Sequence, residues 1–370
     1  MVSHMSGQVS WKNVLKLSGA YVAYLIGSGF ATGQEVLQFF VSYGVNGIYG
    51  AVISAVLFCS LGAILMMNGH ALQLKRPGRV FRYYCGEYLG RAVEYFTMVF
   101  IFSIVVIMIS GSGAITQEFF QMPAMWGVLG MGLLAMVTVL GGLRRMVDII
   151  GAIGPAIVVF TVAVGMVTFF RDFTGTADVV VTAAAEAVQP ADSWWQAGVL
   201  FFCYNMLAGT VFFTELGARA NSRKEAGIAG FTGGLCLMIT VFGMLCGMLA
   251  NFNEVIALQV PNLYLGAKIS PLVAMTFSVI ILLGIYSTTA PMYWLIKNEF
   301  MKYVPEKWEV ALTVALGAVF MTGGSLPFGA LVSLIYPFVG YVGIFMVGVI
   351  FVRTLLKKNT VPEAASSVTD

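Results

Sequence analysis

Residues 27–35 read Gly-Ser-Gly-Phe-Ala-Thr-Gly-Gln-Glu, and they lie in the middle of the first long apolar segment, 13–41. A helix that crosses a bilayer needs about 20 apolar residues, which this segment supplies. Three glycines and the carboxylate of Glu35 interrupt it, and glycine weakens a helix. In lipid, a broken helix survives only where protein or a water-filled cavity satisfies its freed backbone groups. Because broken helices form the substrate and ion sites of many secondary transporters, this stretch predicts a transporter.

The composition predicts an all-α integral membrane protein. Apolar residues make up 59% of the chain and charged residues 10%, whereas soluble domains carry about 25% charged residues. The basic residues behind the net charge of +3 are spread through short loops, so we expect no nucleic-acid partner. The five cysteines are odd in number and lack zinc-type spacing, so we expect neither disulfides nor a structural metal, and no cofactor.

Ten segments are candidate membrane spans: 13–41, 45–69, 92–116, 123–142, 146–170, 194–217, 226–250, 271–296, 308–323 and 327–353. With the N-terminus inside, alternate crossing leaves only Arg171 and Lys268 of the 20 Lys and Arg residues outside. The positive-inside rule requires this asymmetry, so the pattern predicts ten transmembrane helices with both termini cytoplasmic. The apolar outside loop 251–270 is either a lid over a vestibule or an interfacial segment.

The spans divide into two halves of five. The sixth span, like the first, has a polar interruption, Tyr204-Asn205 followed by Gly209, and Pro155 in the fifth span corresponds to Pro337 in the tenth. An odd number of spans per half gives opposite orientations, hence an inverted repeat in which the first and sixth helices are both broken at mid-membrane. We predict unwound segments at 26–30 and 203–209. The predicted parts are an N-terminal tail that resembles an expression remnant, the first repeat, an outside loop, the second repeat and a cytoplasmic tail: 1–10, 11–170, 171–193, 194–353 and 354–370.

Two families resemble this chain at the first break. Gly27-Ser28-Gly29-Phe30 is similar to the Gly-Ser-Gly-Ile-type break in the first helix of the amino acid–polyamine–organocation superfamily. The longer run through Gly33-Gln34-Glu35 and Phe39-Phe40 resembles the YkvI-type family of uncharacterised bacterial membrane proteins. The resemblance implies a LeuT-type fold in the bacterial inner membrane. It also implies secondary transport of a small amino acid or amine by alternating access.

The resemblance also implies where substrate and sodium would bind. In LeuT-type transporters the broken first and sixth helices hold the substrate, and an aromatic ring of the sixth helix, matched by Phe202, caps it. Sodium lies between the first and eighth helices, held by carbonyls that match Ala23 and Ile26. Two hydroxyl residues complete that site, either Ser287 and Thr288, which we select, or the next pair along the chain. The implied substrate residues are Gly27, Ser28, Gly29, Phe30, Phe202, Cys203, Tyr204, Asn205 and Gly209.

The acidic residues of the spans fall into two groups. Glu215 lies four residues before Arg219, which predicts an ion pair, and Glu118 ends the third span as a structural or gating residue. Glu35 has no basic neighbour in sequence. It either neutralises the start of a half-helix or acts in cation coordination, substrate amine capture or proton relay. Some proton-coupled superfamily members carry a lysine in the fifth helix, which is absent here. Sodium symport is therefore favoured, and proton coupling through Glu35 is the alternative.

Other function classes find little support in the sequence. No His-Glu-x-x-His, Gly-x-Ser-x-Gly or nucleotide-binding pattern occurs, so we expect that the protein is not an enzyme. A passive channel or a membrane accessory protein remains a further alternative. The expected partners are a small-molecule substrate and membrane lipid, with the chain as a monomer or weak dimer.

Overall fold

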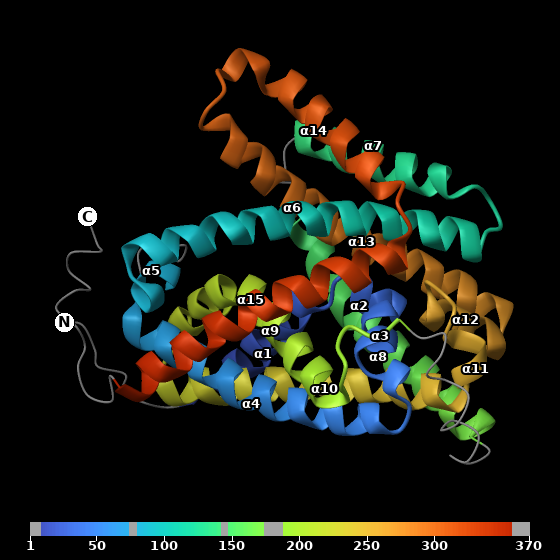
Figure 1. Ribbon diagram of the computed structural model, residues 1–370, viewed down its shortest axis with the longest axis horizontal. Helices are drawn as coiled ribbons and strands as arrows, with labels where there is room; N and C mark the ends of the chain where they lie inside the picture. The colour runs from blue at the N-terminus through green and yellow to red at the C-terminus, as the bar shows by residue number, and fades with distance from the viewer. Residues whose placement is uncertain (1–8, 74–79, 142–146, 174–187, 357–370) are drawn as a thin grey trace.

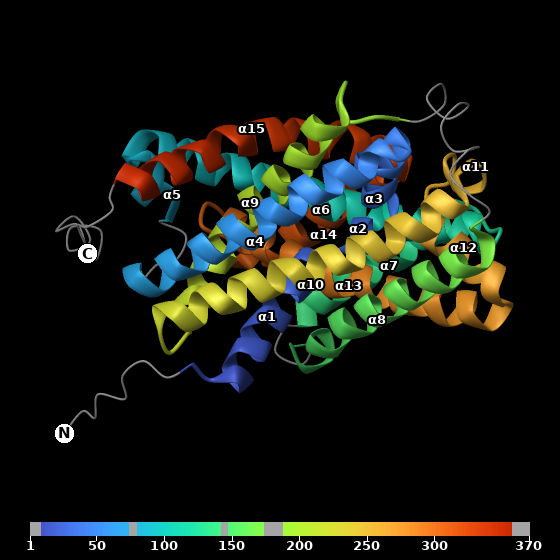
Figure 2. The same ribbon diagram turned by 90° about the horizontal axis from the view of Figure 1, so that it is seen from below.

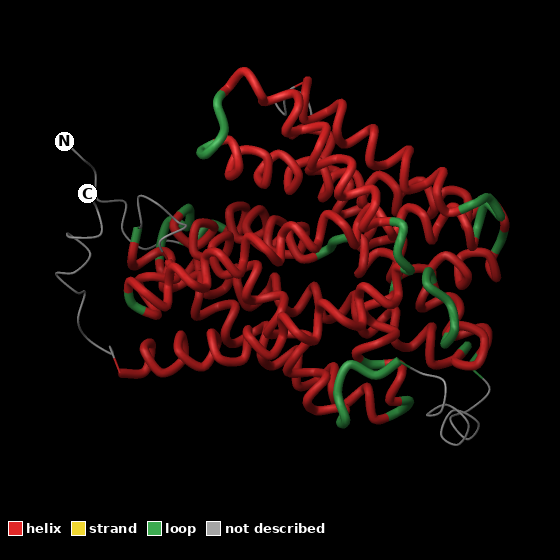
Figure 3. Tube along the Cα trace, turned by 45° about the horizontal axis from the view of Figure 1, so that its top comes forward, coloured by secondary structure: helices red, strands yellow, loops and turns green. Residues whose placement is uncertain are grey.

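The computed structural model describes residues 9–73, 80–141, 147–173 and 188–356, and these parts form helices without strands (Figure 3). The predicted tails and most of the loop 171–193 lie outside the described residues. In chain order the α-helices are α1 Trp11–Leu25, α2 Ser28–Thr32, α3 Gln34–Phe39, α4 Asn46–Leu72, α5 Val80–Cys85, α6 Glu87–Glu118, α7 Ala124–Gly141, α8 Val147–Asp172, α9 Trp194–Ala218, α10 Arg223–Ala250, α11 Phe252–Val255, α12 Pro261–Ile269, α13 Pro271–Met301, α14 Glu309–Gly324 and α15 Phe328–Leu356.

The predicted spans all fall on helices. Within the described residues, eight helices are long and apolar enough to cross a membrane: α4, α6, α7, α8, α9, α10, α13 and α15. The first predicted span is divided among α1, α2 and α3, and the ninth is the 16-residue α14. The chain is therefore an all-α protein built from apolar helices of membrane-spanning length.

Several helix contacts correspond in the pairs that the predicted two-fold repeat requires. If the first five spans are exchanged for the last five, α1 corresponds to α9, α4 to α10, α6 to α13, α7 to α14 and α8 to α15. The contact between α4 and α9 then corresponds to that between α10 and α1, and the contact between α6 and α7 to that between α13 and α14. The contacts of α15 with α9 and of α8 with α1 also correspond. The first and last residues of each repeat stay a prediction.

The first span is broken, and glycine explains how. α1 ends at Leu25, Gly27 has an extended backbone (φ −91°, ψ −170°), and α2 covers only the next five residues. Gly33 then separates α2 from α3 with φ 87°, a left-handed conformation that costs little only for glycine. A Cβ on Gly33 would also overlap the Met248 side chain. The predicted break near 26–30 is therefore present at Ile26 and Gly27, whereas residues 28–30 belong to α2, and a second break follows at Gly33.

The sixth span is not broken, so the prediction of an unwound segment at 203–209 is wrong. α9 is one helix from Trp194 to Ala218. Its polar residues bond to their own helix: Asn205 Nδ2 donates to the Phe201 carbonyl at 2.8 Å and Thr210 Oγ1 to the Met206 carbonyl at 2.6 Å. Such local bonds satisfy a polar side chain within the helix and leave its geometry intact.

The molecule has two distinct ends. α5, the end of α4 and the end of α15 lie at the left in Figures 1 and 2, and α11 and α12 lie at the right. We call these the α5 end and the α12 end. Arg171 and Lys268, the two basic residues predicted outside, meet at the α12 end, where Arg171 Nη1 donates to the Lys268 carbonyl at 2.7 Å. The predicted pair of Arg219 with Glu215 is confirmed at 2.5 Å.

Candidate functional site

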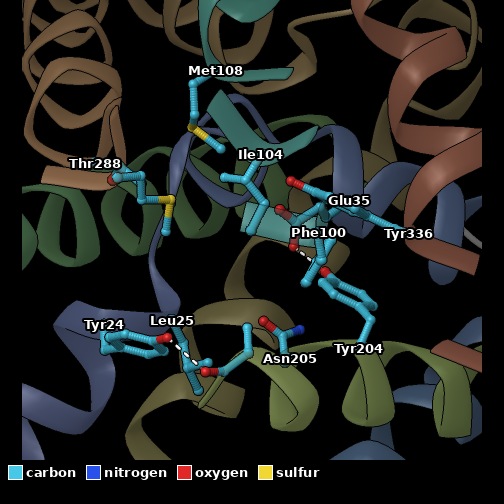
Figure 4. Close-up of a pocket in the computed structure, with 13 residues that line it drawn as sticks. Tyr24, Leu25, Glu35, Phe100, Ile104, Met108, Tyr204, Asn205, Thr288 and Tyr336 are labelled. Carbon is cyan, nitrogen blue, oxygen red and sulfur yellow. Dashed lines mark hydrogen bonds between the residues drawn. The ribbon is translucent and has the colours of Figure 1, made fainter. Parts of the chain in front are cut away.

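A cavity of about 60 Å³ lies where α1 gives way to α2, in the middle of the helix bundle (Figure 4). This volume is the space open to the centre of a water-sized sphere. One water needs about 10–15 Å³ of such space, so the cavity holds a few water molecules or one small polar group. The broken first span and α6 supply Tyr24, Leu25, Gly27, Glu35, Phe100, Ile104 and Met108. The other lining residues come from α9, α13 and α15: Tyr204, Asn205, Ala208, Thr288, Met292 and Tyr336.

Glu35 is the one charged residue among those that line the cavity. It lies in the first turn of α3 and is 5% exposed. The Tyr204 hydroxyl donates a hydrogen bond to Oε2, and Oε1 lies so close to Gly29 that a Cβ there would overlap it. Gly29 therefore allows the carboxylate to fold back over the first turn of α2. An uncompensated carboxylate in an apolar interior is costly, which makes Glu35 a functional candidate.

Aromatic rings form much of the cavity wall. Tyr204 and Tyr336 stack with ring centroids 4.7 Å apart and an interplanar angle of 18°. Phe100 meets Tyr336 edge-on at 6.2 Å. On the opposite side, the Tyr24 hydroxyl donates to the Ala208 carbonyl at 2.8 Å, which joins α1 to α9 beside the cavity (Figure 4). The rings surround a carboxylate, and no basic side chain is among the lining residues.

The structure brings together part of the predicted substrate site. Gly27, Tyr204 and Asn205 line the cavity, and Gly29 contacts Glu35. The side chain of Ser28 is outside the described part of the structure.

The remaining predicted substrate residues do not line the cavity. The ring of Phe202, predicted as the outer lid, packs against Phe58 of α4 at 5.0 Å. The Cys203 backbone packs against Gly343 of α15, Gly209 faces the ring of Phe213 within α9, and Phe30 is 1% exposed in the core. Because α9 stays helical, its successive side chains point to different neighbours. The residues of α9 that line the cavity are those at 204, 205 and 208.

Of the four predicted sodium ligands, Thr288 lines the cavity, whereas Ala23, Ile26 and Ser287 do not. Both hydroxyls donate to the Gly284 carbonyl, at 2.8 Å from Ser287 and 3.2 Å from Thr288. On α1, the Gly27 amide donates to the Leu25 carbonyl and not to that of Ala23, which a continuous helix would use. The hydroxyl lone pairs and the Ala23 carbonyl are oxygen acceptors of the kind that a sodium site needs.

α12 is bonded to α2 at the α12 end of the bundle. Asn262 Nδ2 in α12 donates to the Ala31 carbonyl of α2 at 3.0 Å and also lies against Gly33. The alternatives for the loop 251–270, a lid or an interfacial segment, stay a prediction.

Glu118 and Gln38 form further hydrogen bonds between helices at the same end of the bundle. Glu118, the last residue of α6, accepts hydrogen bonds from the amides of Gln259 at 2.7 Å and Val260 at 2.9 Å, directly before α12. Gln38 Nε2 of α3 donates to the Gly329 carbonyl of α15 at 2.9 Å. Side chain-to-backbone bonds at the α12 end therefore join α12 to α2, α6 to the residues before α12, and α3 to α15.

The sequence did not identify several of the residues that line the cavity. Tyr24, Phe100 and Tyr336 come from three different helices, and nothing in their local sequence distinguishes them from other aromatic residues of the spans. Tyr336 directly precedes Pro337, a residue that the repeat did single out. That proximity is the one signal in the sequence that pointed towards it.

Comparison with known proteins gives two curated relatives from Bacillus subtilis (strain 168). The uncharacterised membrane protein YkvI is 22% identical over 346 residues, which cover 93% of this chain and 97% of the relative. The uncharacterised protein YyaD is 22% identical over 355 residues, 94% of this chain and 99% of the relative. No protein-family model matches the chain.

Two solved structures share the fold. Mhp1 in its inward-facing conformation superposes with a TM-score of 0.63 at 14% identity, over 93% of this chain and 76% of Mhp1. A mutant of the Eremococcus coleocola manganese transporter superposes with a TM-score of 0.52 at 11% identity, over 100% of this chain and 92% of that one. The second of these structures is of a manganese transporter, and at this level of identity the likeness shows the fold alone. Together the relatives and the structures confirm the resemblance to the YkvI-type membrane proteins and assign the chain the LeuT-type fold.

Proposed function

We propose that the protein is a secondary active transporter that carries a small substrate with an amino group by alternating access. The observation that carries this proposal is the cavity at the break of the first span, which bears one carboxylate, Glu35. A ligand site at mid-membrane beside a discontinuous helix is the arrangement by which secondary transporters expose a site to one side at a time.

The charges at the two ends of the bundle indicate how it is oriented in the membrane. Arg91 near the start of α6, Arg223 at the start of α10 and Lys302 after the end of α13 lie towards the α5 end. Arg171 and Lys268 lie at the α12 end. By the positive-inside rule the α5 end is cytoplasmic. The protein then lies in the bacterial cytoplasmic membrane with both termini inside, and the α12 end faces outward.

For coupling, we favour sodium held by Ser287, Thr288 and the carbonyls of Ala23 and Ile26. Thr288 lines the cavity opposite the end of α1, and the interrupted helix leaves carbonyls free of their usual amide partners. Half-helix ends with unwound carbonyls coordinate sodium in transporters with broken helices. Sodium bound there would stabilise the bend of the first span, and by linkage sodium and substrate would each tighten the other's binding.

Proton coupling through Glu35 is a second candidate, and a specific observation favours it. Glu35 is a buried carboxylate that accepts a hydrogen bond from a neutral tyrosine, Tyr204. Intramembrane carboxylates of this kind serve as proton carriers in pumps and transporters. A proton on Glu35 would remove its charge during the return step, when no substrate is bound.

Uptake by the purified protein in liposomes tests the function and separates the two couplings. We expect saturable uptake of alanine or a small amine driven by an inward sodium gradient, and loss of the sodium dependence in the double variant Ser287→Ala/Thr288→Ala. Ser60→Ala is the matched control, because Ser60 is an exposed hydroxyl on α4 with the same kind of backbone bond, 2.6 Å to Val56.

Uptake driven by a pH gradient without sodium, and lost in Glu35→Gln, would establish the proton alternative. Equal uptake with and without either gradient would contradict secondary active transport and favour a passive channel.

A further inference from the structure

Several hydrogen-bond donors of the cavity wall are already used by the protein, although the Tyr336 hydroxyl also lines the cavity. The Tyr24 hydroxyl donates to the Ala208 carbonyl, and Thr288 to the Gly284 carbonyl. Tyr204 donates to Glu35, and the Asn205 amide nitrogen donates to the backbone of its own helix. A hydroxyl has a single hydrogen, so these tyrosine and threonine side chains can offer a ligand only their lone pairs.

The side chains that line the cavity also carry hydrogen-bond acceptors. Glu35 is an acceptor with two oxygens, and the side-chain oxygen of Asn205 is another acceptor among the lining residues. Met292 adds a thioether sulfur, which is a weak acceptor. These acceptors favour a ligand that carries hydrogen-bond donors.

An anionic ligand group has no comparable place. The first turn of α2, where freed backbone amides would favour an anion, already faces the carboxylate of Glu35, since Oε1 lies against Gly29. No Lys or Arg is among the lining residues. A substrate carboxylate would have to displace Glu35 or lie next to it, and two like charges in an apolar interior repel strongly.

The rings favour a cation at the same place. Tyr204 and Tyr336 stack beside Glu35, and Tyr24 and Phe100 close other sides of the cavity (Figure 4). Aromatic faces attract ammonium groups, and the attraction is larger where water is excluded. Carboxylate, acceptors and rings all select the same chemistry.

From this arrangement we infer that the cavity binds an organic ammonium without a carboxylate, and that it discriminates against amino acids. The inference rests on the proposed function, because it takes the cavity as the substrate site. Within that function it specifies an amine where the resemblance left open an amino acid or an amine.

Three isosteric probes test this inference on the purified full chain in detergent. Isopropylamine is alanine with a methyl group in place of the carboxylate, and isobutyrate is alanine with a methyl group in place of the amine. Each is titrated at pH 7, and the midpoint of thermal unfolding is measured, because a ligand of the folded state raises it. We expect the largest rise with isopropylamine, a smaller one with alanine and none with isobutyrate.

Glu35→Gln sharpens the test, because glutamine keeps the size of the side chain and can still accept from Tyr204. We expect isopropylamine to bind roughly tenfold or more weakly to this variant, since a charge-assisted hydrogen bond is lost. Glu215→Gln is the matched control: Glu215 lies on α9, is exposed and pairs with Arg219, so binding should not change.

The possible results separate the two proposals. A larger midpoint rise with alanine or isobutyrate than with isopropylamine, or no rise with the amine at all, overturns the inference. If alanine is then accumulated in liposomes by an ion gradient, the proposed function stands without it. If isopropylamine binds as expected but no gradient drives its uptake, the amine site stands and the transport function fails. Failure of Glu35→Gln to fold leaves the probe series on the unaltered protein decisive.

Discussion

The first and sixth spans occupy matching places in the repeat, yet one is broken twice and the other is a single helix. In the first span the chain leaves the helix at Gly27 and again at Gly33, where φ is 87°. In α9, Tyr204 and Asn205 keep helical geometry. The difference teaches that a polar pair does not break a membrane helix. At Gly33 the helix is broken by glycine in a left-handed conformation that other residues disfavour, whereas Gly27 is extended.

The two spans therefore contribute to the cavity in different ways. The first supplies freed backbone at Gly27 and a carboxylate held over Gly29. The sixth supplies the side chains of Tyr204 and Asn205 from a regular helix. Under the proposed function, we expect the first span to change conformation during transport. We expect α9 to keep its helical conformation.

The largest effect should come from Gly33→Ala. It forces a left-handed alanine and overlaps Met248, so we expect a loss of about 1–3 kcal/mol in the free energy of unfolding, seen as a lower thermal midpoint. Gly19→Ala in α1 is the control, because a Cβ there meets nothing within 4 Å. That change should be neutral or stabilising by about 0.5–1 kcal/mol. Equal midpoints for both variants would contradict the role given to Gly33.

Gly29→Ala tests the break through binding instead of stability. The new Cβ would push the Glu35 carboxylate off the first turn of α2, so ligand affinity should fall by roughly tenfold or more while the protein still folds. Isopropylamine titrations of the variant measure this loss. In Gly130→Ala on α7, where the Cβ also meets nothing, affinity should stay the same. An unchanged affinity in Gly29→Ala would show that Glu35 does not hold the ligand.

Asn205→Ala probes the unbroken span, and its effect should be smaller. One neutral acceptor is lost from the cavity, so the uptake KM should rise about two- to tenfold, corresponding to about 0.5–1.5 kcal/mol. Thr210→Ala removes a similar side chain-to-backbone bond of α9 away from the lining, and its KM should not change. The same KM in Asn205→Ala and the unaltered protein would remove Asn205 from the site.

Asn262→Ala should have the smallest effect. It removes one bond between α12 and α2, worth about 0.5–1.5 kcal/mol, and so shifts the equilibrium towards opening at the α12 end. A cysteine introduced at Thr288, with the natural cysteines removed, should react up to about tenfold faster with a thiol reagent added outside. A slower reaction would mean that α12 does not close the cavity.

Local sequence signals were sufficient for much of the fold. Apolar length and loop charge located the spans, and glycine located the break at 26–30, because each depends on neighbouring residues alone. Tyr204-Asn205 gave a wrong prediction for α9, since the geometry of a helix depends on whether its own backbone satisfies the polar groups. The pair of Glu215 with Arg219 was predictable because its partners lie one turn apart.

The site required long-range packing that one sequence does not encode locally. Glu35 was identified because a carboxylate inside an apolar span is rare. Its contact with Tyr204, by contrast, joins residues that are 169 positions apart. Phe202 was expected in the cavity and Tyr336 was not, because the rotation of a helix about its axis is set by neighbours such as Phe58. The same holds for the bonds between Glu118 and the residues before α12.

An experimental structure of the protein with isopropylamine bound tests the central claim most directly. We predict the nitrogen within hydrogen-bond distance of Glu35, the rings of Tyr204 and Tyr336 beside it, and α9 helical from Trp194 to Ala218 as it is without ligand. A ligand bound away from Glu35, or an α9 that unwinds at 203–209 around it, would contradict the account.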